Sequence, residues 1–149
     1  MVPAYRIVRA VLAVIAVGVV VLALTRGHDV RSCDGARREA FALAVDRGAP
    51  PPLDEGRGLA ARLIAVCRGS DGLAPSAQAL VLARALDGAE LVAQEAIARD
   101  PDAFQAHNAL ASVLEARGDA AGAQRERGEA RRLNPLAPVP PATRVAPDG

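Results

Sequence analysis

Aromatic side chains are nearly missing from this chain of 149 residues, which has no tryptophan, one tyrosine and two phenylalanines. Aromatic residues normally supply much of the buried area of a core, yet 51% of the residues here are hydrophobic. The apolar part therefore consists mainly of alanine, leucine and valine. Alanine and leucine, like the arginines and glutamates around them, are strong helix formers. The composition predicts an all-α protein.

Lysine is absent as well, and neither sign of charge is in excess. All 18 basic residues are arginines, and 17 acidic residues leave a formal net charge of +1. Arginine in place of lysine is typical of a GC-rich genome, so it does not by itself indicate nucleic-acid binding. A charge this close to zero excludes a strongly basic nucleic-acid module and an acidic solvating tail. We expect no nucleic-acid partner.

Side chains that carry chemistry are scarce too. The two histidines and two cysteines are too few for a metal site. The stretches 56–58 and 69–72 contain glycines but lack the spacing of a phosphate-binding loop, and no positioned acid–base pair is recognisable. We therefore expect no catalytic residue, no cofactor, no metal and no small-molecule substrate, and we expect that the protein is not an enzyme.

One long apolar run stands near the N-terminus. Residues 10–24 carry no charged or polar side chain. A membrane-spanning helix needs roughly 17–25 apolar residues, and Arg9 lies close enough to the end of the run to reach the head groups. The pattern predicts a short tail at 1–6, a transmembrane helix or signal anchor at 7–25 and a linker at 26–32.

A cleaved signal peptide fits the same segment. Arg6 and Arg9 then form its charged start, and Val21 and Ala23 supply the small residues before a cleavage site. With cleavage the protein is secreted; without cleavage it is a single-pass membrane protein.

The clearest pattern in the rest of the chain is a helix–turn–helix unit. The first helix begins at Phe104, and Gly118 and Asp119 fit the end of one helix and the start of the next. The second helix ends before Pro135, because proline disfavours the helical conformation in the residue that precedes it. Residues 102–135 therefore form one antiparallel helix pair.

This unit resembles the tetratricopeptide repeat (TPR), a helix–turn–helix motif of 34 residues. The positions that carry the resemblance are Leu110, Ala111, Leu114, Gly118, Asp119, Ala123, Ala130 and Pro135. Two positions depart from the family pattern, since His107 stands where tryptophan is common and Arg127 where an aromatic residue is common. We expect these departures to thin the core and to leave the repeat geometry intact.

A degenerate repeat precedes it at 73–101. Ala89, Ala96 and Pro101 stand one repeat length before the two small residues and the closing proline of the next unit. Pro75 suits the first turn of a helix, so we expect the first helix of this repeat to run from about residue 74 to about residue 86.

A more divergent helical pair is expected at 33–69, with helices at 34–47 and 54–68 around a proline-rich turn. The last segment, 136–149, is rich in proline and without periodicity, which is typical of a disordered tail. The expected architecture is thus an N-terminal transmembrane helix followed by about three stacked antiparallel helix pairs of TPR type.

The two cysteines stand at the same open end of the divergent pair, because Cys33 begins its first helix and Cys67 ends its second. A disulfide there would close a loop of roughly 34 residues and contribute on the order of 3–4 kcal/mol. Disulfides persist outside the cytosol, so the pair favours an extracytoplasmic body. The arginines that follow the apolar run favour a cytoplasmic body, and two unpaired cysteines remain an alternative.

TPR proteins are interaction modules in which the first helix of each pair lines a concave groove. The resemblance therefore implies a scaffold or assembly factor that binds a protein partner at the membrane, here in a bacterial cell envelope. The candidate groove residues are Gln105, Asn108, Ser112 and Glu115. A secreted or cytosol-facing adaptor is the alternative, and a non-catalytic subunit of an enzyme complex is a more distant one.

Overall fold

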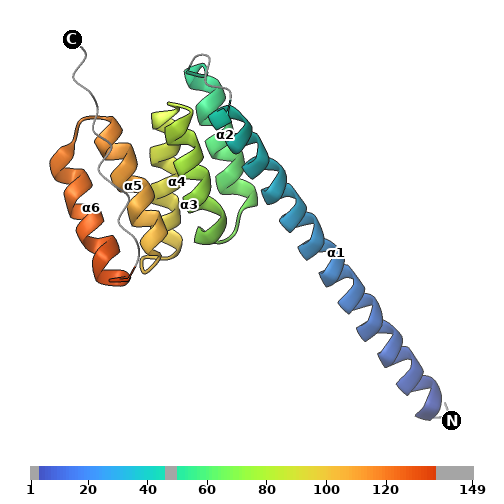
Figure 1. Cartoon of the computed structure of the whole chain (residues 1–149). Helices are drawn as coiled ribbons and strands as arrows, with labels where there is room; N and C mark the ends of the chain where they lie inside the picture. The colour runs from blue at the N-terminus through green and yellow to red at the C-terminus, as the bar shows by residue number, and fades with distance from the viewer. Residues whose placement is uncertain (1–3, 46–49, 137–149) are drawn as a thin grey trace.

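The computed structural model describes the backbone of residues 4–45 and 50–136, and within the first range it describes side chains at 12, 14–19 and 32–45. This part of the chain forms six α-helices and no strand, which confirms the all-α prediction for the described residues. The helices are α1 (Ala4–Val45), α2 (Leu53–Val66), α3 (Ser70–Leu82), α4 (Leu86–Arg99), α5 (Phe104–Ala116) and α6 (Ala120–Leu133) (Figure 1). Residues 1–3 of the expected tail and 137–149 of the expected disordered segment lie outside the described residues.

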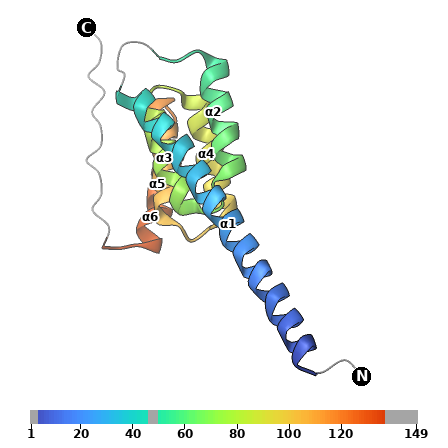
Figure 2. The same cartoon turned by 90° about the vertical axis from the view of Figure 1, so that its right-hand side faces the viewer.

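The longest helix, α1, has 42 residues and runs without a break from the apolar segment into the helical bundle. Figures 1 and 2 show its C-terminal part against the bundle and its N-terminal part projecting away from it. The expected linker at 26–32 is wrong as a separate element, because it is part of this helix. A single glycine in that stretch costs a helix only about 1 kcal/mol, and no proline interrupts it.

Among the residues that the structure describes, no helix combines the length and the apolarity that a membrane crossing requires. Much of the expected span, at 7–11, 13 and 20–25, lies outside the residues whose side chains the structure describes. The side chains of α1 that are described in this region are strongly exposed, from 56% at Ile15 to 72% at Val14.

Each helix packs against the next helix along the chain or against the helix after that. Helix α3 packs against α4, and α5 packs against α6, while α1 contacts both α2 and α3. Helices α3 and α5 also lie side by side, as do α2 and α4. Figures 1 and 2 show the resulting two-layered array, with α1, α3 and α5 in one layer and α2 and α4 in the other. Within the described residues α6 packs against α5 alone.

The turn between α5 and α6 has the backbone that its sequence predicts. Gly118 adopts a φ of 84°, a left-handed conformation that glycine reaches without a steric penalty. The next amide, of Asp119, donates to the carbonyl of Leu114 at 2.9 Å and thereby closes the end of α5. The Asp119 carboxylate then accepts from the amide of Gly122 at 2.8 Å, which caps the start of α6.

The turn between α3 and α4 follows the same path without a glycine. Arg84 adopts a φ of 59°, and the amide of Ala85 donates to the carbonyl of Leu80 at 2.9 Å. The expectation that this helix continues to about residue 86 is therefore wrong, because α3 ends at Leu82 and α4 begins at Leu86.

The start of α3 also differs from the expectation. The helix begins at Ser70, four residues before the expected start at about residue 74, and includes most of the glycine-containing stretch 69–72. Pro75 consequently lies in the second turn of α3, where its ring removes one backbone hydrogen bond. Asp71 stabilises the beginning of the helix, because its carboxylate lies in the first turn, next to the positive end of the helix dipole.

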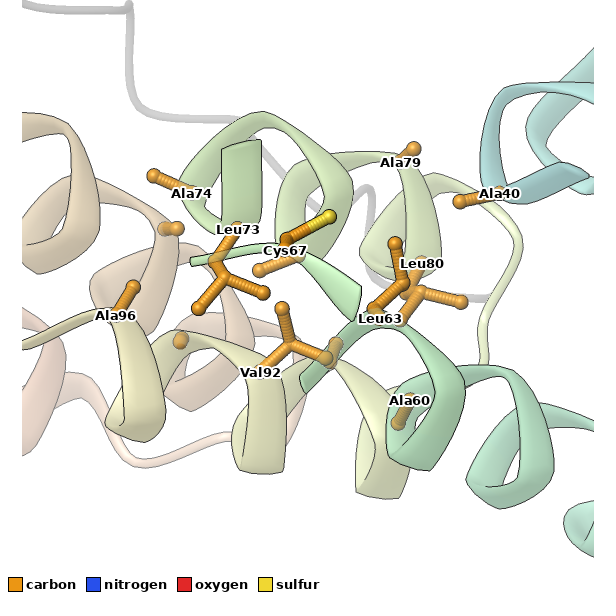
Figure 3. Packing of buried hydrophobic residues seen from close by; sticks show 14 of the residues in the cluster. Ala40, Ala60, Leu63, Cys67, Leu73, Ala74, Ala79, Leu80, Val92 and Ala96 are labelled. Carbon is orange, nitrogen blue, oxygen red and sulfur yellow. The ribbon is translucent and has the colours of Figure 1, made fainter. Parts of the chain in front are cut away.

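The core consists largely of alanine, with a few leucines and valines between the two layers (Figure 3). The largest fully buried aliphatic side chains are Leu59, Leu63, Leu73, Leu80, Val92 and Val113. Among the TPR-signature positions, Ala89, Ala96, Ala111, Ala123 and Ala130 are buried, Leu110 and Leu114 are half-buried, and Pro101 and Pro135 are exposed.

Glycines let α2 and α4 approach closely. A Cβ atom at Gly88 would lie 2.5 Å from the carbonyl oxygen of Gly56 and 3.4 Å from the Cβ of Ala60. The two backbones therefore touch without intervening side chains at this crossing, which is how helices pack in a core with so few large residues.

Candidate functional site

A surface cavity of about 370 Å³ lies between α3 and α5. Its lining residues are Asp71, Ala74, Pro75, Gln78, Gln105 and Asn108. Two of the four candidate groove residues, Gln105 and Asn108, therefore border one cavity. They face it from α5, and α3 supplies the opposite wall.

The third candidate residue, Ser112, joins the same surface through a hydrogen bond. The side-chain amide of Gln78 on α3 donates to the Ser112 hydroxyl on α5 at 3.1 Å, and that hydroxyl donates to the carbonyl of Asn108 at 3.0 Å. Gln78 and Ser112 are one repeat length apart, at corresponding positions of neighbouring helices. The bond fixes one edge of the cavity and orients the Gln78 side chain.

The fourth candidate residue, Glu115, points elsewhere. Its carboxylate pairs with the guanidinium of Arg127 on α6, and both side chains border a second hollow together with Ala123 and Arg131. Glu115 is therefore not among the residues that line the cavity between α3 and α5. The charge of Arg127 on the neighbouring helix holds Glu115 against α6 and away from α3.

The cavity between α3 and α5 offers amide and hydroxyl groups and one carboxylate. Asn and Gln side chains both donate and accept hydrogen bonds, so Gln78, Gln105 and Asn108 can match the donors and acceptors of a polypeptide backbone. Asp71 is the single charged residue in the lining. Arg117, the basic residue at the end of α5, pairs with Asp87 and Glu90 on α4 instead.

His107 is buried beneath α6 and does not border this cavity. Its Nδ1 lies 2.8 Å from a carboxylate oxygen of Glu126, and its Nε2 lies 3.0 Å from the carbonyl oxygen of Pro101. Burial lowers the pKa of His107, but the hydrogen bonds to Glu126 and Pro101 and the nearby charge of Glu129 outweigh it and raise the pKa above 6.5. Since both partners only accept, the doubly protonated ring satisfies them both.

The other departure from the family pattern also has a polar partner, because Arg127 pairs with Glu115. The two departures thus place polar contacts between α5 and α6 where the family pattern has aromatic packing.

The two cysteines lie at the N-terminal end of the array, where α1, α2 and α3 meet, far from the α5–α6 pair in the order of helices. The sulfur atoms of Cys33 and Cys67 are 2.08 Å apart and their Cα atoms 4.8 Å apart, so the structure places them at disulfide distance. Gly72 on α3 makes room for the bridge, since a Cβ atom there would lie 3.2 Å from the sulfur of Cys33. The bridge therefore holds α1 and the end of α2 next to the start of α3.

Arg99, at the end of α4, binds the end of α2 next to the disulfide. Its guanidinium donates to the carbonyl oxygen of Ile64 at 2.7 Å and to that of Cys67, two groups that the end of α2 leaves without helical partners. Its Nε donates to Glu95 at 2.7 Å. Arg99 thus caps one helix from the end of another.

Sequence reasoning missed the α3 wall of the cavity. Asp71 stands before the expected start of the helix and Pro75 at that start, so neither was expected in the wall of a cavity. Nothing in the local sequence around Gln78 marks it as a cavity residue. Its place one repeat length before Ser112 could have identified it. Within the part of the chain that the structure describes, no group of three or more His, Cys, Asp or Glu side chains could hold a metal ion.

Comparisons of this chain with models of protein families, with curated proteins and with solved structures found no match.

Proposed function

We propose that this chain is a membrane-anchored, non-enzymatic interaction protein of TPR type, which holds or assembles a protein complex at a cell envelope. The observation that carries the proposal is the cavity between α3 and α5, whose lining combines Gln78, Gln105 and Asn108 with small apolar side chains. Such a surface suits an extended polypeptide segment, because amide side chains can bond its backbone while Ala74 and Pro75 contact its side chains.

The repetition of equivalent positions in α3 and α5 is a second observation that supports this function. Corresponding residues of α3 and α5 lie side by side, as the bond from Gln78 to Ser112 requires. The two turns with left-handed residues at 84 and 118 recur at the repeat length. An array of this kind presents the first helix of each pair on one face, which is where the cavity lies.

Photo-crosslinking tests the binding surface in the full-length chain. A photoreactive residue at Gln105 should give a crosslinked adduct in membranes of the native cell, and Asn108→Arg should abolish it by filling the cavity. The matched control carries the photoreactive residue at Gln94, an exposed glutamine on α4. Equal adducts from positions 105 and 94, or an adduct at 105 that survives Asn108→Arg, would contradict binding in the cavity.

The anchor is the second part of the proposal. In the N-terminal part of α1, the apolar side chains of Leu12, Val14 and Val17 are each at least 60% exposed. Exposure of so much apolar surface to water is unfavourable and marks an interaction site. A charge in the middle of a membrane segment costs about 2.5–3.5 kcal/mol. Val17→Arg should therefore weaken flotation with phosphatidylcholine vesicles, whereas Leu91→Arg, at an exposed leucine of the bundle, should not. Equal flotation of the two variants would rule out the anchor.

The cysteine pair supports an extracytoplasmic body, since disulfides persist outside the cytosol. A membrane-impermeant thiol reagent applied to intact cells should label Cys33 and Cys67 only after reductant is added. Labelling without reductant and only after lysis would favour the cytosol-facing adaptor. A secreted protein would leave the cell fraction altogether, and co-purification with an active enzyme would favour the non-catalytic subunit.

A further inference from the structure

The two halves of the disulfide differ in their exposure to solvent. Cys67 is 1% exposed, and its carbonyl oxygen is held by Arg99. Cys33 is half-buried. A surface cavity of about 270 Å³ borders the bridge, with Asp34, Arg37 and Gly72 in its lining. Both cysteines line this cavity. Because Cys67 is almost completely covered and Cys33 is half-buried, Cys33 is the half of the bridge that solvent and small solutes reach more readily.

The bridge is a covalent link between α1 and the bundle, and the noncovalent contacts of α1 with the bundle are small. Among the described residues of α1, Ala36 and Ala40 are the buried apolar side chains, and Leu43 and Ala44 pack against the core half-buried. Alanine buries little surface, so Leu43 is the one large aliphatic side chain among these contacts. The Glu39–Arg62 ion pair to α2 is exposed on both sides, and exposed pairs add little stability. Helix α3, by contrast, buries two leucines, Leu73 and Leu80, completely.

We propose that the Cys33–Cys67 disulfide is a redox latch that holds α1 on the bundle, and that a dithiol reductant opens it by attack at Cys33. Opening leaves α1 with two buried alanines and the half-buried Leu43 and Ala44 as its apolar attachment, so α1 separates from α2 and α3 while α3 to α6 stay folded. The latch joins the long projecting helix to the part of the molecule that carries the cavity between α3 and α5.

The exchange step follows from the exposure of the two sulfurs. A thiolate of the dithiol attacks the sulfur of Cys33 and forms a new S–S bond, the Cys33–Cys67 bond breaks, and the electron pair leaves on the sulfur of Cys67, which takes up a proton. The second thiol of the reductant then attacks the reductant's own sulfur in the mixed disulfide and releases Cys33 as a thiol. The chain gains two hydrogens, and the dithiol becomes a disulfide.

The site of attack can be read directly on the oxidised, full-length protein. Glutathione is added as the probe thiol, free thiols are blocked at once with N-ethylmaleimide, and trypsin releases Cys33 and Cys67 in separate peptides that end at Arg37 and Arg68. We expect the glutathione adduct on Cys33 and maleimide on Cys67, with the Cys33 adduct in about tenfold excess. Equal adducts, or an excess on Cys67, would overturn attack at Cys33.

The release of α1 is tested by limited proteolysis, because cleavage of a helix follows the population of its open form. Reduction, or the Cys33→Ala/Cys67→Ala double variant without reductant, should accelerate cleavage after Arg38 by about tenfold or more. Cleavage after Arg125 on α6 is the internal control and should not change. Unchanged cleavage after Arg38 would show that the bridge is no latch, and parallel acceleration at both sites would show global unfolding instead of release.

Discussion

Arg84 occupies, between α3 and α4, the left-handed backbone conformation that Gly118 occupies between α5 and α6. Their φ angles are 59° and 84°, and the amide that follows each of them closes the preceding helix in the same way. An L-residue in this conformation costs roughly 1–2 kcal/mol, whereas glycine adopts it freely. One of two equivalent turns is therefore strained and the other is not.

Arg84→Gly should raise the free energy of unfolding by about 1 kcal/mol, because it relieves this strain. Gly118→Arg is the reciprocal variant and should lower it by a similar amount. Urea unfolding followed by circular dichroism measures both. Shifts of the same sign in the two variants would show that the turn conformation is not the cause.

The close crossing of α2 and α4 makes a second prediction. Gly88→Ala places a Cβ atom 2.5 Å from the carbonyl oxygen of Gly56, so the helices must separate, and overpacking of this kind costs about 1–3 kcal/mol. Gly58→Ala is the matched control, because nothing lies within 4 Å of its Cβ position. That control should gain about 0.5–1 kcal/mol from better helix propensity. A neutral Gly88→Ala in thermal unfolding would contradict the observed helix spacing.

His107 should make stability depend on pH near neutrality. The pKa of His107 is raised in the folded protein, so its stabilising contribution is complete below about pH 6.5 and is lost as the pH rises through the folded-state pKa. His107→Gln keeps a donor but does not titrate. The difference in unfolding free energy between wild type and His107→Gln should therefore shrink from about pH 6 to about pH 9. A constant difference across this range would mean that the imidazolium is not the stabilising form.

Arg99 should matter more than an ordinary surface arginine. Arg99→Ala removes the donors to the carbonyl oxygens of Ile64 and Cys67, and charged hydrogen bonds of this kind are worth about 1.5–3 kcal/mol. Arg125→Ala, on the exposed side of α6, should change stability by less than about 0.5 kcal/mol. Chemical denaturation of both variants under oxidising conditions measures the difference. Similar losses would show that helix α2 does not depend on this cap.

The sequence allows α5 and α6 to be placed almost to the residue. Glycine at 118, aspartate at 119 and proline at 135 are local signals whose effect on the backbone hardly depends on the rest of the fold. The pairing of Cys33 with Cys67 also follows from the expected antiparallel hairpin, in which the two cysteines share one end. The structure keeps that neighbourhood, although Cys33 lies within α1 and not at the start of a helix.

The missed features depend on tertiary contacts. Arg84 turns the chain without the glycine that normally marks such a turn, and α3 begins early enough to include Pro75. The segment at 26–32 looked like a linker because it is polar, but helix on both sides continues through it. Glu115 does not line the cavity with the other candidate groove residues, because its partner, Arg127, lies on another helix. No pattern within one helix can reveal such a pair.

The Glu115–Arg127 pair also sets the chemical character of the α6 end of the array. At the corresponding positions one repeat length earlier stand Val81 and Ala93, of which Ala93 is buried. Any further helix pair, or a second copy docked end to end, would have to bury a charge pair, and the desolvation penalty of such burial can exceed the Coulomb attraction. The α6 end of the array therefore carries a charge pair where the preceding repeat carries apolar side chains, and this pair opposes the docking of another helix pair there.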